Sequence, residues 1–315
     1  VADPFRHPID GAKSLLTPIG SLGDKLRVGM MRMGLLSSRT MTDDCSTINA
    51  LDHMGFGDSM INRFWKPFMR GVFLENELST TIRKFEETFR FFSKGDTVLP
   101  KKGIGEIPRQ LAGKLPREHI LLETEISKVD SNSVESSDGA KWEGRAVVLA
   151  TEDYHANQLL SLGKGHAEWN SVVCLYFSLA VDDLPSDERI LYLDGTGNGP
   201  INNLTFVSTL CDCAPVGQAL ASVSVIGKKE LDMQEIANQA KEQLTEWFGE
   251  KAEGWKYLKG YRIHQAVPSC PTPPSPKPSL TEVYRCGDYF GLPSIDSAMK
   301  SGRITAEHII QEFQS

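Results

Sequence analysis

The segment that most constrains this fold lies near the C-terminus, where a short apolar strand runs into Gly-Asp, crosses a turn and enters a helix. The strand spans residues 281–286 and delivers Gly287 and Asp288 to its carboxyl end. Open α/β sheets place their ligands at that end of a strand. Gly287 has no side chain, so the backbone can come close to a bound group. The segment therefore predicts an α/β fold with a ligand site at this edge.

The polar groups around this turn suit a ligand that carries hydroxyls and negative charge. Asp288 can accept hydrogen bonds from sugar hydroxyls, or from water that bridges to phosphate. Ser294 is expected to cap the following helix, which leaves the amides of Ile295 and Asp296 unpaired at the positive end of the helix dipole. Small residues such as Ala298 allow the helix to pack closely on a cofactor or on a neighbouring helix. Its apolar positions are expected to face the core, at Met299, Ile304, Ile309 and Ile310.

The first hundred residues are predicted to be helical, because apolar residues recur there at helical spacing. Asp24 lies early in the first helix, where a negative charge suits the helix dipole. Asp58 is expected to cap a later helix, which Pro67 should end or kink. The Phe and Met stripes fit a packed core better than a pocket for an apolar ligand. The stripes are Leu22, Leu26, Met30 and Met33; Ile48, Leu51 and Met54; Ile61, Phe64 and Trp65; and Ile82, Phe85, Phe89 and Phe92.

Beyond residue 100 the pattern changes to short strands. Alternating apolar residues predict strand structure over 119–131, including Ile120 and Leu122, and a continuous apolar run at 145–151 predicts a strand buried on both faces. Prolines crowd residues 268–279, which we expect to form an extended connection. Further strands are expected over 172–181, 190–194, 203–210, 219–226 and 255–267, with an amphipathic helix over 232–249 that carries Ile236, Ala240, Leu244 and Trp247 on one side.

Composition and charge argue against several classes of protein. The net charge of −7 and the lack of a Lys/Arg block argue against a nucleic-acid partner, which needs clustered positive charge. The six cysteines lack paired CxxC spacing and the seven histidines form no metal motif, so we expect reduced thiols and no metal. No apolar run approaches the roughly 18 residues of a membrane span. The start at Val1 shows neither a signal nor a transit peptide, which is typical of an interior or processed piece of a longer chain.

The C-terminal segment resembles the last flavin-binding motif of the flavin amine oxidase superfamily, which includes amine oxidases, protoporphyrinogen oxidase and desaturases such as phytoene desaturase. Ser297 stands where that family usually has Gly. Residues 55–74 resemble the desaturase and protoporphyrinogen oxidase members more than the other members of the superfamily. Residues 102–112, 120–131, 145–151 and 261–268 resemble further family elements in the same order. The matching motif residues are Gly287, Asp288, Ser294, Ala298, Ser301 and Gly302.

This resemblance implies an FAD/NAD(P)-binding flavoprotein fold, with an interleaved and incomplete cofactor domain and an α+β substrate domain. Residues 100–160 and 279–315 would form the FAD domain segments, 1–99 the helical part of the substrate domain, and 161–278 its strands and helix. The backbone at Ile126 would hold the adenine, while Gly287, Asp288, Ala298 and the helix end at Ser294, Ile295 and Asp296 would hold the flavin. No strand with a GxGxxG loop occurs in residues 1–315, so part of the cofactor domain is expected to be missing.

The function that the resemblance implies is an FAD-dependent oxidoreductase that takes hydride from a C–H bond of an apolar or amine substrate. No catalytic base is assigned. The alternative is a non-catalytic, truncated or degenerate member that acts as a binding module. A nicotinamide-linked enzyme is a further alternative, but no second Gly-rich loop supports it. By resemblance to the desaturases, a plastid location and peripheral membrane association would fit; otherwise we expect a cytoplasmic protein, with oligomeric state and electron acceptor left open.

Overall fold

The computed structural model describes residues 16–36, 41–162, 168–227, 230–269 and 283–314. The chain divides into two compact units, and each unit is built from two separate segments. The first unit comprises Val1–Ile104 and Asn170–Ala266, and the second comprises Gly105–Trp169 and Val267–Ser315. Most of the predicted Pro-rich connection lies outside the described residues.

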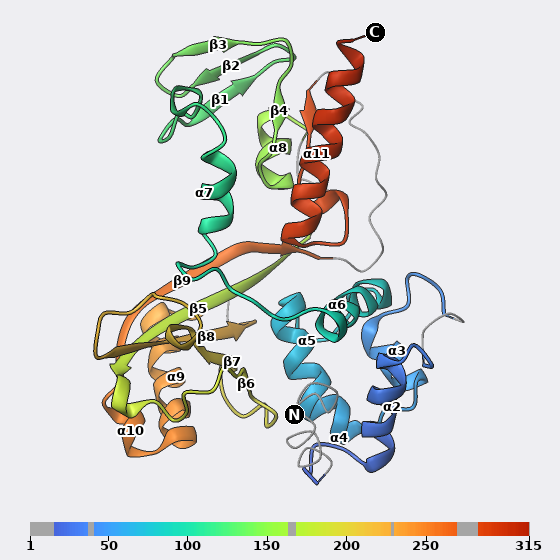
Figure 1. The fold of residues 1–315 in the computed structure, drawn as a ribbon, viewed down its shortest axis with the longest axis vertical. Coiled ribbons are helices and arrows are strands. Elements are labelled where there is room, and N and C mark those ends of the chain that lie inside the picture. Colours follow the sequence, from blue (N-terminus) through green and yellow to red (C-terminus); the bar gives the residue numbers. More distant parts are fainter. Residues whose placement is uncertain (1–15, 37–40, 163–167, 228–229, 270–282, 315) are drawn as a thin grey trace. The chain divides into compact units, whose positions relative to one another are not determined.

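The first unit begins with a group of helices whose apolar side chains converge on Trp65. This side chain is 1% exposed, and its ring lies edge-on to Phe56 and Phe85 at centroid distances of 5.6 and 5.3 Å. Met69 and Phe85 are fully buried beside it. The predicted stripes at 48–54, 61–65 and 82–89 therefore build a core. The helices are α2 (Leu22–Arg32), α3 (Thr47–His53), α4 (Asp58–Met60), α5 (Lys66–Phe73) and α6 (Ile82–Lys94), with a π-helical turn over Ile61–Trp65 (Figure 1).

Two details of these helices differ from the sequence-based expectation. Asp58 lies in the first turn of α4 and does not cap it, because Gly57 occupies the N-cap position. Pro67 does not end the helix, since it lies in the first turn of α5. It follows the π-helical turn, where the amide of Lys66 bonds to the carbonyl of Ile61 five residues back. Because Pro67 has no amide to donate, this change of register lets the chain continue directly into α5.

The first helix, α2, forms where predicted but presents a different face to the core. Its predicted stripe, Leu22, Leu26, Met30 and Met33, is exposed, whereas Met31 is buried. Asp24 is also buried, and it forms a capping box with Ser21 at the start of the helix. The capping box marks the start of this helix, whereas the apolar spacing does not identify its buried side.

The first unit also contains a five-stranded sheet in the order β6-β7-β8-β5-β9. Side chains of β5 alternate between buried and half-buried, as expected for a sheet with one face on a core. β5 pairs antiparallel with β8 from Val172 opposite Ile226 to Ala180 opposite Gln218. The strands are β5 (Trp169–Ala180), β6 (Tyr192–Leu193), β7 (Ile201–Phe206), β8 (Gln218–Ile226) and β9 (Lys256–Pro268).

The helix α9 (Met233–Phe248) covers this sheet and is followed by the short α10 (Glu250–Glu253). Ile236, Ala240 and Leu244 are all 0% exposed and pack in one cluster with Leu175 and Phe177 of β5. The strands and the helix predicted for this part of the chain are found, but the strand predicted over 203–210 ends at Phe206, because Val207–Thr209 form a 3-10 turn, and the one predicted over 190–194 is limited to Tyr192–Leu193. Their shared core forms because the apolar stripe of α9 meets the apolar face of the sheet.

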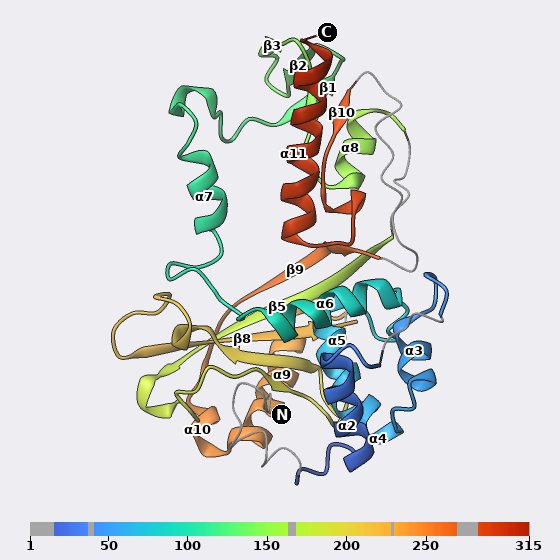
Figure 2. The same cartoon turned by 45° about the vertical axis from the view of Figure 1, so that its right-hand side comes forward.

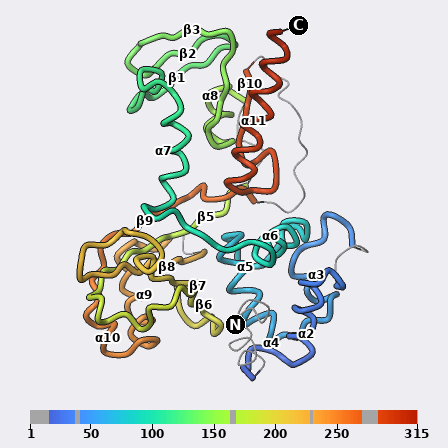
Figure 3. The backbone as a smooth tube through the Cα atoms, in the orientation of Figure 1, coloured from blue at the N-terminus to red at the C-terminus, as the bar shows by residue number. Residues whose placement is uncertain are grey.

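The second unit brings together segments that lie far apart in the sequence, as the green and red parts of the tube show (Figure 3). A three-stranded antiparallel sheet has the order β1-β2-β3, and β4 pairs in parallel with β10. The elements are α7 (Glu106–Ala112), β1 (Ile126–Val129), β2 (Ser133–Ser136), β3 (Lys141–Glu143), β4 (Val148–Leu149), α8 (Asp153–Leu159), β10 (Tyr284–Arg285) and α11 (Ile295–Glu312).

Two strand predictions in this unit are wrong in extent. Residues 117–119 form a 3-10 turn, Leu122 is 80% exposed, and pairing begins only at Ile126. The run at 145–151 contributes only Val148 and Leu149 to a strand, and Val148 is 42% exposed. Its only partner strand among the described residues is β10, so the predicted burial on both faces is not found. The overall mixed α/β flavoprotein fold is confirmed. Within the described part of the chain, no helix is both long and apolar enough to cross a membrane.

Candidate functional site

The candidate site is built where β10 ends and the chain turns into α11 (Figure 2). Pairing with β4 fixes the strand, since the amides of Tyr284 and Cys286 donate to Val147 and Leu149 at 3.0 Å. The amide of Gly287 donates to Ser301 Oγ at 3.1 Å. This bond ties the end of the strand to the second turn of α11. The predicted sequence of strand, Gly-Asp, turn and helix is thus present in the structure.

Gly287 is required here by a close neighbour. A Cβ atom at this position would clash with the ring of Tyr289, whose Cζ would lie 2.9 Å away. We expected the space beside Gly287 to admit a ligand, but in this structure the Tyr289 ring occupies it. Burial raises the pKa of the Tyr289 hydroxyl, and the positive charge of Arg285 offsets part of that rise. Tyr289 is a residue of the site that sequence reasoning missed.

A buried ion pair lies directly beneath this turn. Arg285 Nη2 lies 2.6 Å from Asp153 Oδ1, and the two side chains are 13% and 9% exposed. The guanidinium also lies 5.6 Å from the centre of the Tyr289 ring. Arg285 Nε and Asp153 Oδ2 are buried without a partner among the described residues. The sequence signal for this pair was an arginine inside the apolar strand that leads to Gly287.

The N-terminus of α11 offers free hydrogen-bond donors. Ser294 caps the helix as predicted, because its Oγ accepts from the amide of Ser297 at 3.1 Å. Across the described residues, the amides of Ile295 and Asp296 have no acceptor, and both residues are exposed. These two donors lie at the positive end of an 18-residue helix. This end of α11 therefore suits an anionic or strongly polar group.

The side of α11 that carries its small residues is open. Ala298 is exposed, and a Cβ atom added at Gly302 would meet nothing within 4 Å. Asp288 is half-buried at the start of a 3-10 turn over Asp288–Phe290, and its carbonyl accepts from the amide of Gly291 at 3.1 Å. Unpaired amides, a nearby carboxylate and open space along small residues together fit a flavin nucleotide. Gly287, Asp288, Ser294, Ile295, Asp296 and Ala298 lie in one continuous turn and helix start.

The structure does not join Ile126 to this turn. Ile126 begins β1 in the three-stranded sheet, where it pairs with Ser136. Among the described residues, no hydrogen bond links Ile126 to residues 287–298. Both positions belong to the second unit. The assignment of Ile126 to the adenine stays a prediction.

The expected core face of α11 is wrong. Met299, Ile304 and Ile310 are 50%, 51% and 55% exposed, and α11 has no buried residue in the described structure. Only Ile309 of the four predicted core positions is half-buried. The helix packs on β10 through polar residues instead, since Thr305 Oγ1 donates to the carbonyl of Arg285 at 3.3 Å.

Three solved structures resemble this chain over most of its length. An oxidoreductase from Methanosarcina mazei matches with a TM-score of 0.72 and 14% identity, over 91% of this chain and 73% of that one. A wild-type putrescine oxidase bound to putrescine matches with a TM-score of 0.69 and 13% identity, over 94% and 77%. A cyclohexylamine oxidase from Brevibacterium oxydans matches with a TM-score of 0.61 and 14% identity, over 97% and 75%. At these identities the likeness shows the fold.

The curated proteins contain no match to this chain. The model of the family of flavin containing amine oxidoreductases, in contrast, matches residues 8–310. That match spans both units and includes the turn between β10 and α11. The chain belongs to the family of flavin containing amine oxidoreductases.

Proposed function

We propose that this protein is an FAD-dependent oxidoreductase that removes hydride from a C–H bond of an amine or apolar substrate. Electrons would then pass to oxygen or a quinone. The observation that carries the proposal is the family match across residues 8–310. The known activities of structural neighbours, a putrescine oxidase and a cyclohexylamine oxidase, favour an amine as the substrate.

The second unit would supply the contacts to the cofactor. When bound, FAD supplies the hydride acceptor, and the protein supplies position and electrostatics. The amides of Ile295 and Asp296 would hold negative charge at the end of α11, because unpaired helix N–H groups and the dipole act together there. Asp288 would accept hydrogen bonds from the hydroxyls of the sugar chain. The open side of α11 at Ala298 would allow close approach of the ring system.

The first test is the visible absorbance of the 315-residue chain after addition of FAD and desalting. Retained oxidised-flavin bands are expected, and bleaching by an amine under anaerobic conditions would identify a reducing substrate. A chain that stays colourless would show that the site at α11 does not hold FAD without the GxGxxG loop that residues 1–315 lack, and would contradict the proposal for this chain. Retained flavin that no amine or apolar compound bleaches would favour the alternative of a non-catalytic binding module.

The Asp288→Ala variant tests the assigned site directly. We expect it to retain less FAD than the unchanged chain at equal protein concentration, because a hydrogen-bond acceptor for the cofactor is lost. The matched control is Asp130→Ala, which removes an exposed carboxylate from the same unit. Equal flavin retention in Asp288→Ala and the control would overturn the role of Asp288.

A further inference from the structure

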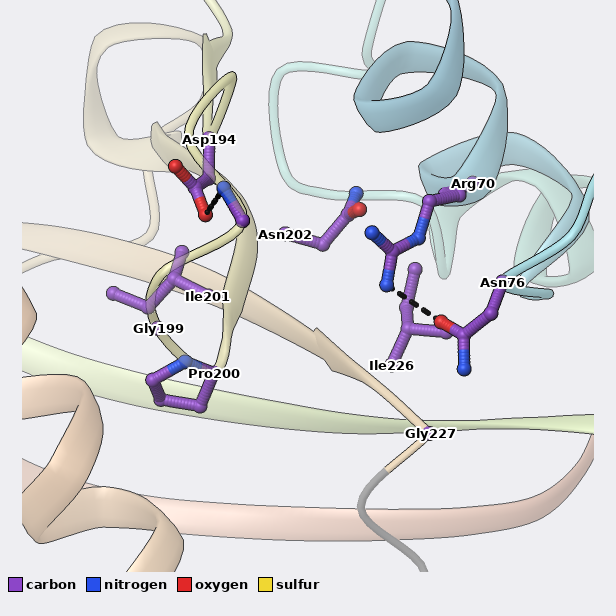
Figure 4. A pocket seen from close by; sticks show the side chains of 10 residues that line it. Arg70, Asn76, Asp194, Gly199, Pro200, Ile201, Asn202, Ile226 and Gly227 are labelled. Carbon is purple, nitrogen blue, oxygen red and sulfur yellow. Dashed lines mark hydrogen bonds between the residues drawn. The ribbon is translucent and has the colours of Figure 1, made fainter. Parts of the chain in front are cut away.

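The first unit contains a polar cavity that the flavin chemistry does not explain. Its volume is about 320 Å³, which lies at the small end of the roughly 300–1,000 Å³ range of ligand pockets. The cavity lies between α5, the loop that joins α5 to α6 and contains Asn76, and the strands β7 and β8 (Figure 4). The lining residues that matter for its chemistry are Arg70, Asn76, Asp194 and Asn202.

Arg70 gives the cavity an incompletely paired positive charge. Its Nη2 donates to Asn76 Oδ1 at 2.6 Å, whereas its Nε is buried with no partner among the described residues. Gly227 permits this arrangement, because a Cβ atom there would lie 2.6 Å from Asn76 Nδ2. A guanidinium has five N–H donors, so the Nε–H and the N–H groups that Asn76 does not use can together bond to a carboxylate.

Asn202 adds a hydrogen-bond acceptor to the same cavity. The side chain is 5% exposed, and its Nδ2 donates to the carbonyl of Pro67 at 3.0 Å and to Asn203 Oδ1 at 2.9 Å. Both partners are acceptors, so the amide orientation is fixed and Oδ1 is the atom left over. In the described structure Asn202 Oδ1 is buried without a donor. A buried acceptor of this kind is expected to receive a hydrogen bond.

The wall opposite Arg70 carries a carboxylate, Asp194, whose position is fixed by hydrogen bonds from the backbone (Figure 4). Asp194 is 8% exposed and accepts from the amides of Thr196 and Gly197 at 2.9 and 3.0 Å. The neighbouring backbone is anchored by Gln243 Oε1, which accepts from the amide of Ile201 at 2.9 Å. A cavity with one cationic and one anionic wall disfavours a dianion and suits a ligand that carries both a carboxylate and a hydrogen-bond donor.

We propose that this cavity binds a small carboxylate that carries an adjacent hydroxyl or ammonium group, as in 2-hydroxy acids and 2-amino acids. The carboxylate bonds to Arg70, and the hydroxyl or ammonium donates to Asn202 Oδ1. The negative charge of Asp194 attracts the ammonium of an amino acid. All the residues involved lie in the first unit, so the binding does not depend on the flavin or on the proposed redox function.

The test is calorimetric titration of the full chain with a set of three-carbon compounds and phosphate. Lactate and alanine are expected to bind saturably. Propionate lacks the donor, lactamide lacks the carboxylate, and phosphate carries excess negative charge, so each is expected to bind at least about tenfold more weakly. If propionate binds as tightly as lactate and alanine, or if phosphate binds best, the assignment is overturned. Heat changes without saturation for every compound would mean that the cavity holds only water, which also overturns it.

Variants locate the binding within the cavity. Arg70→Gln should weaken the binding of lactate and alanine at least about tenfold, because the charged donor pair is lost. Arg90→Gln makes the same change of charge at an exposed residue of α6 and should bind both compounds like the unchanged chain. Equal binding by the two variants would refute the site. If Arg70→Gln fails to fold, the ligand series on the unchanged chain still decides, since it needs no substitution.

Discussion

The two units of the molecule differ in the contacts that stabilise the interior of each. The first unit contains two large apolar clusters, one centred on Trp65 and one between α9 and the five-stranded sheet. Among its described residues, the second unit has a buried apolar cluster of Leu149, Ala156 and Val283, with partly buried neighbours. Beside that cluster lies the buried ion pair of Arg285 and Asp153. The second unit thus depends far more on polar contacts than the first.

The two longest helices show the same contrast. The 16-residue α9 buries Ile236, Ala240 and Leu244 of its apolar stripe at 0% exposure, and Trp247 is half-buried. The 18-residue α11 buries no residue in the described structure, and its Ile295 and Ile310 are each 55% exposed. Both sequences carry apolar residues at helical spacing. The comparison teaches that such spacing predicts a helix, whereas the burial of the stripe depends on what the rest of the chain places against it.

The largest expected effect comes from breaking the ion pair of the second unit. Asp153→Ala leaves Arg285 buried without its partner, and loss of one member of a buried pair costs about 3–5 kcal/mol. We expect the free energy of unfolding to fall by that amount, with hydrogen exchange speeding up most at β4 and β10. Urea unfolding and hydrogen exchange measure the two effects.

A double variant separates the charge from the packing. Asp153→Leu combined with Arg285→Met removes both charges and fills the space with apolar side chains, so it should lose less stability than Asp153→Ala alone. If Asp153→Ala lowers the free energy of unfolding by less than about 1 kcal/mol, the pair behaves like an exposed ion pair. The second unit would then not depend on polar contacts more than the first.

The second prediction compares the same substitution on the two helices. Ile236→Ala opens a cavity under α9 and should cost about 2–5 kcal/mol. Ile310→Ala on α11 removes an exposed side chain and should change the free energy of unfolding by no more than about 0.5 kcal/mol. Urea midpoints of the two variants, measured side by side, give the difference.

The outcome for Ile310→Ala sharpens the comparison. A loss as large as that of Ile236→Ala would mean that the stripe of α11 is covered in solution by a contact that the described residues do not make. The difference between the helices would then lie in what covers α11 and not in how the second unit is stabilised.

Much of the fold could be predicted from local sequence patterns, but the site could be predicted only in part. Spacing alone located α9 and its buried side, including Ile236 and Leu244. The turn at Gly287 and the cap at Ser294 were also predictable, because they depend on neighbours within a few residues. Asp153 and Arg285 are 132 residues apart in sequence, so their pairing depends on β4 meeting β10. The cavity at Arg70 and Asn202 likewise needs tertiary packing, which local periodicity does not encode.

The smallest expected effect concerns Asp24, the main buried carboxylate of the helical group in the first unit. Its Oδ2 accepts from the Ser21 amide and hydroxyl at 2.8 and 2.6 Å, and its Oδ1 accepts from the amide of Gly57 at 2.9 Å. Burial alone would raise the pKa of Asp24, but these hydrogen bonds and the charge of Arg27 outweigh it and lower the pKa below its ordinary value. Asp24→Asn should cost about 1–3 kcal/mol at neutral pH, because the charged acceptor is lost.

The lowered pKa fixes the direction of the pH dependence for this variant. A carboxylate with a folded pKa below its unfolded value contributes stability that is complete above the unfolded value and is lost as the pH falls through the folded one. The difference between the unchanged chain and Asp24→Asn should therefore be constant from pH 7 down to about 5 and should shrink below pH of about 4. Asp52→Asn, at an exposed position of α3, is the control and should stay within about 0.5 kcal/mol of the unchanged chain. If the stability difference between the unchanged chain and Asp24→Asn grew on acidification, burial and not hydrogen bonding would dominate the pKa of Asp24. The first unit would then also contain a buried polar group that destabilises it when charged.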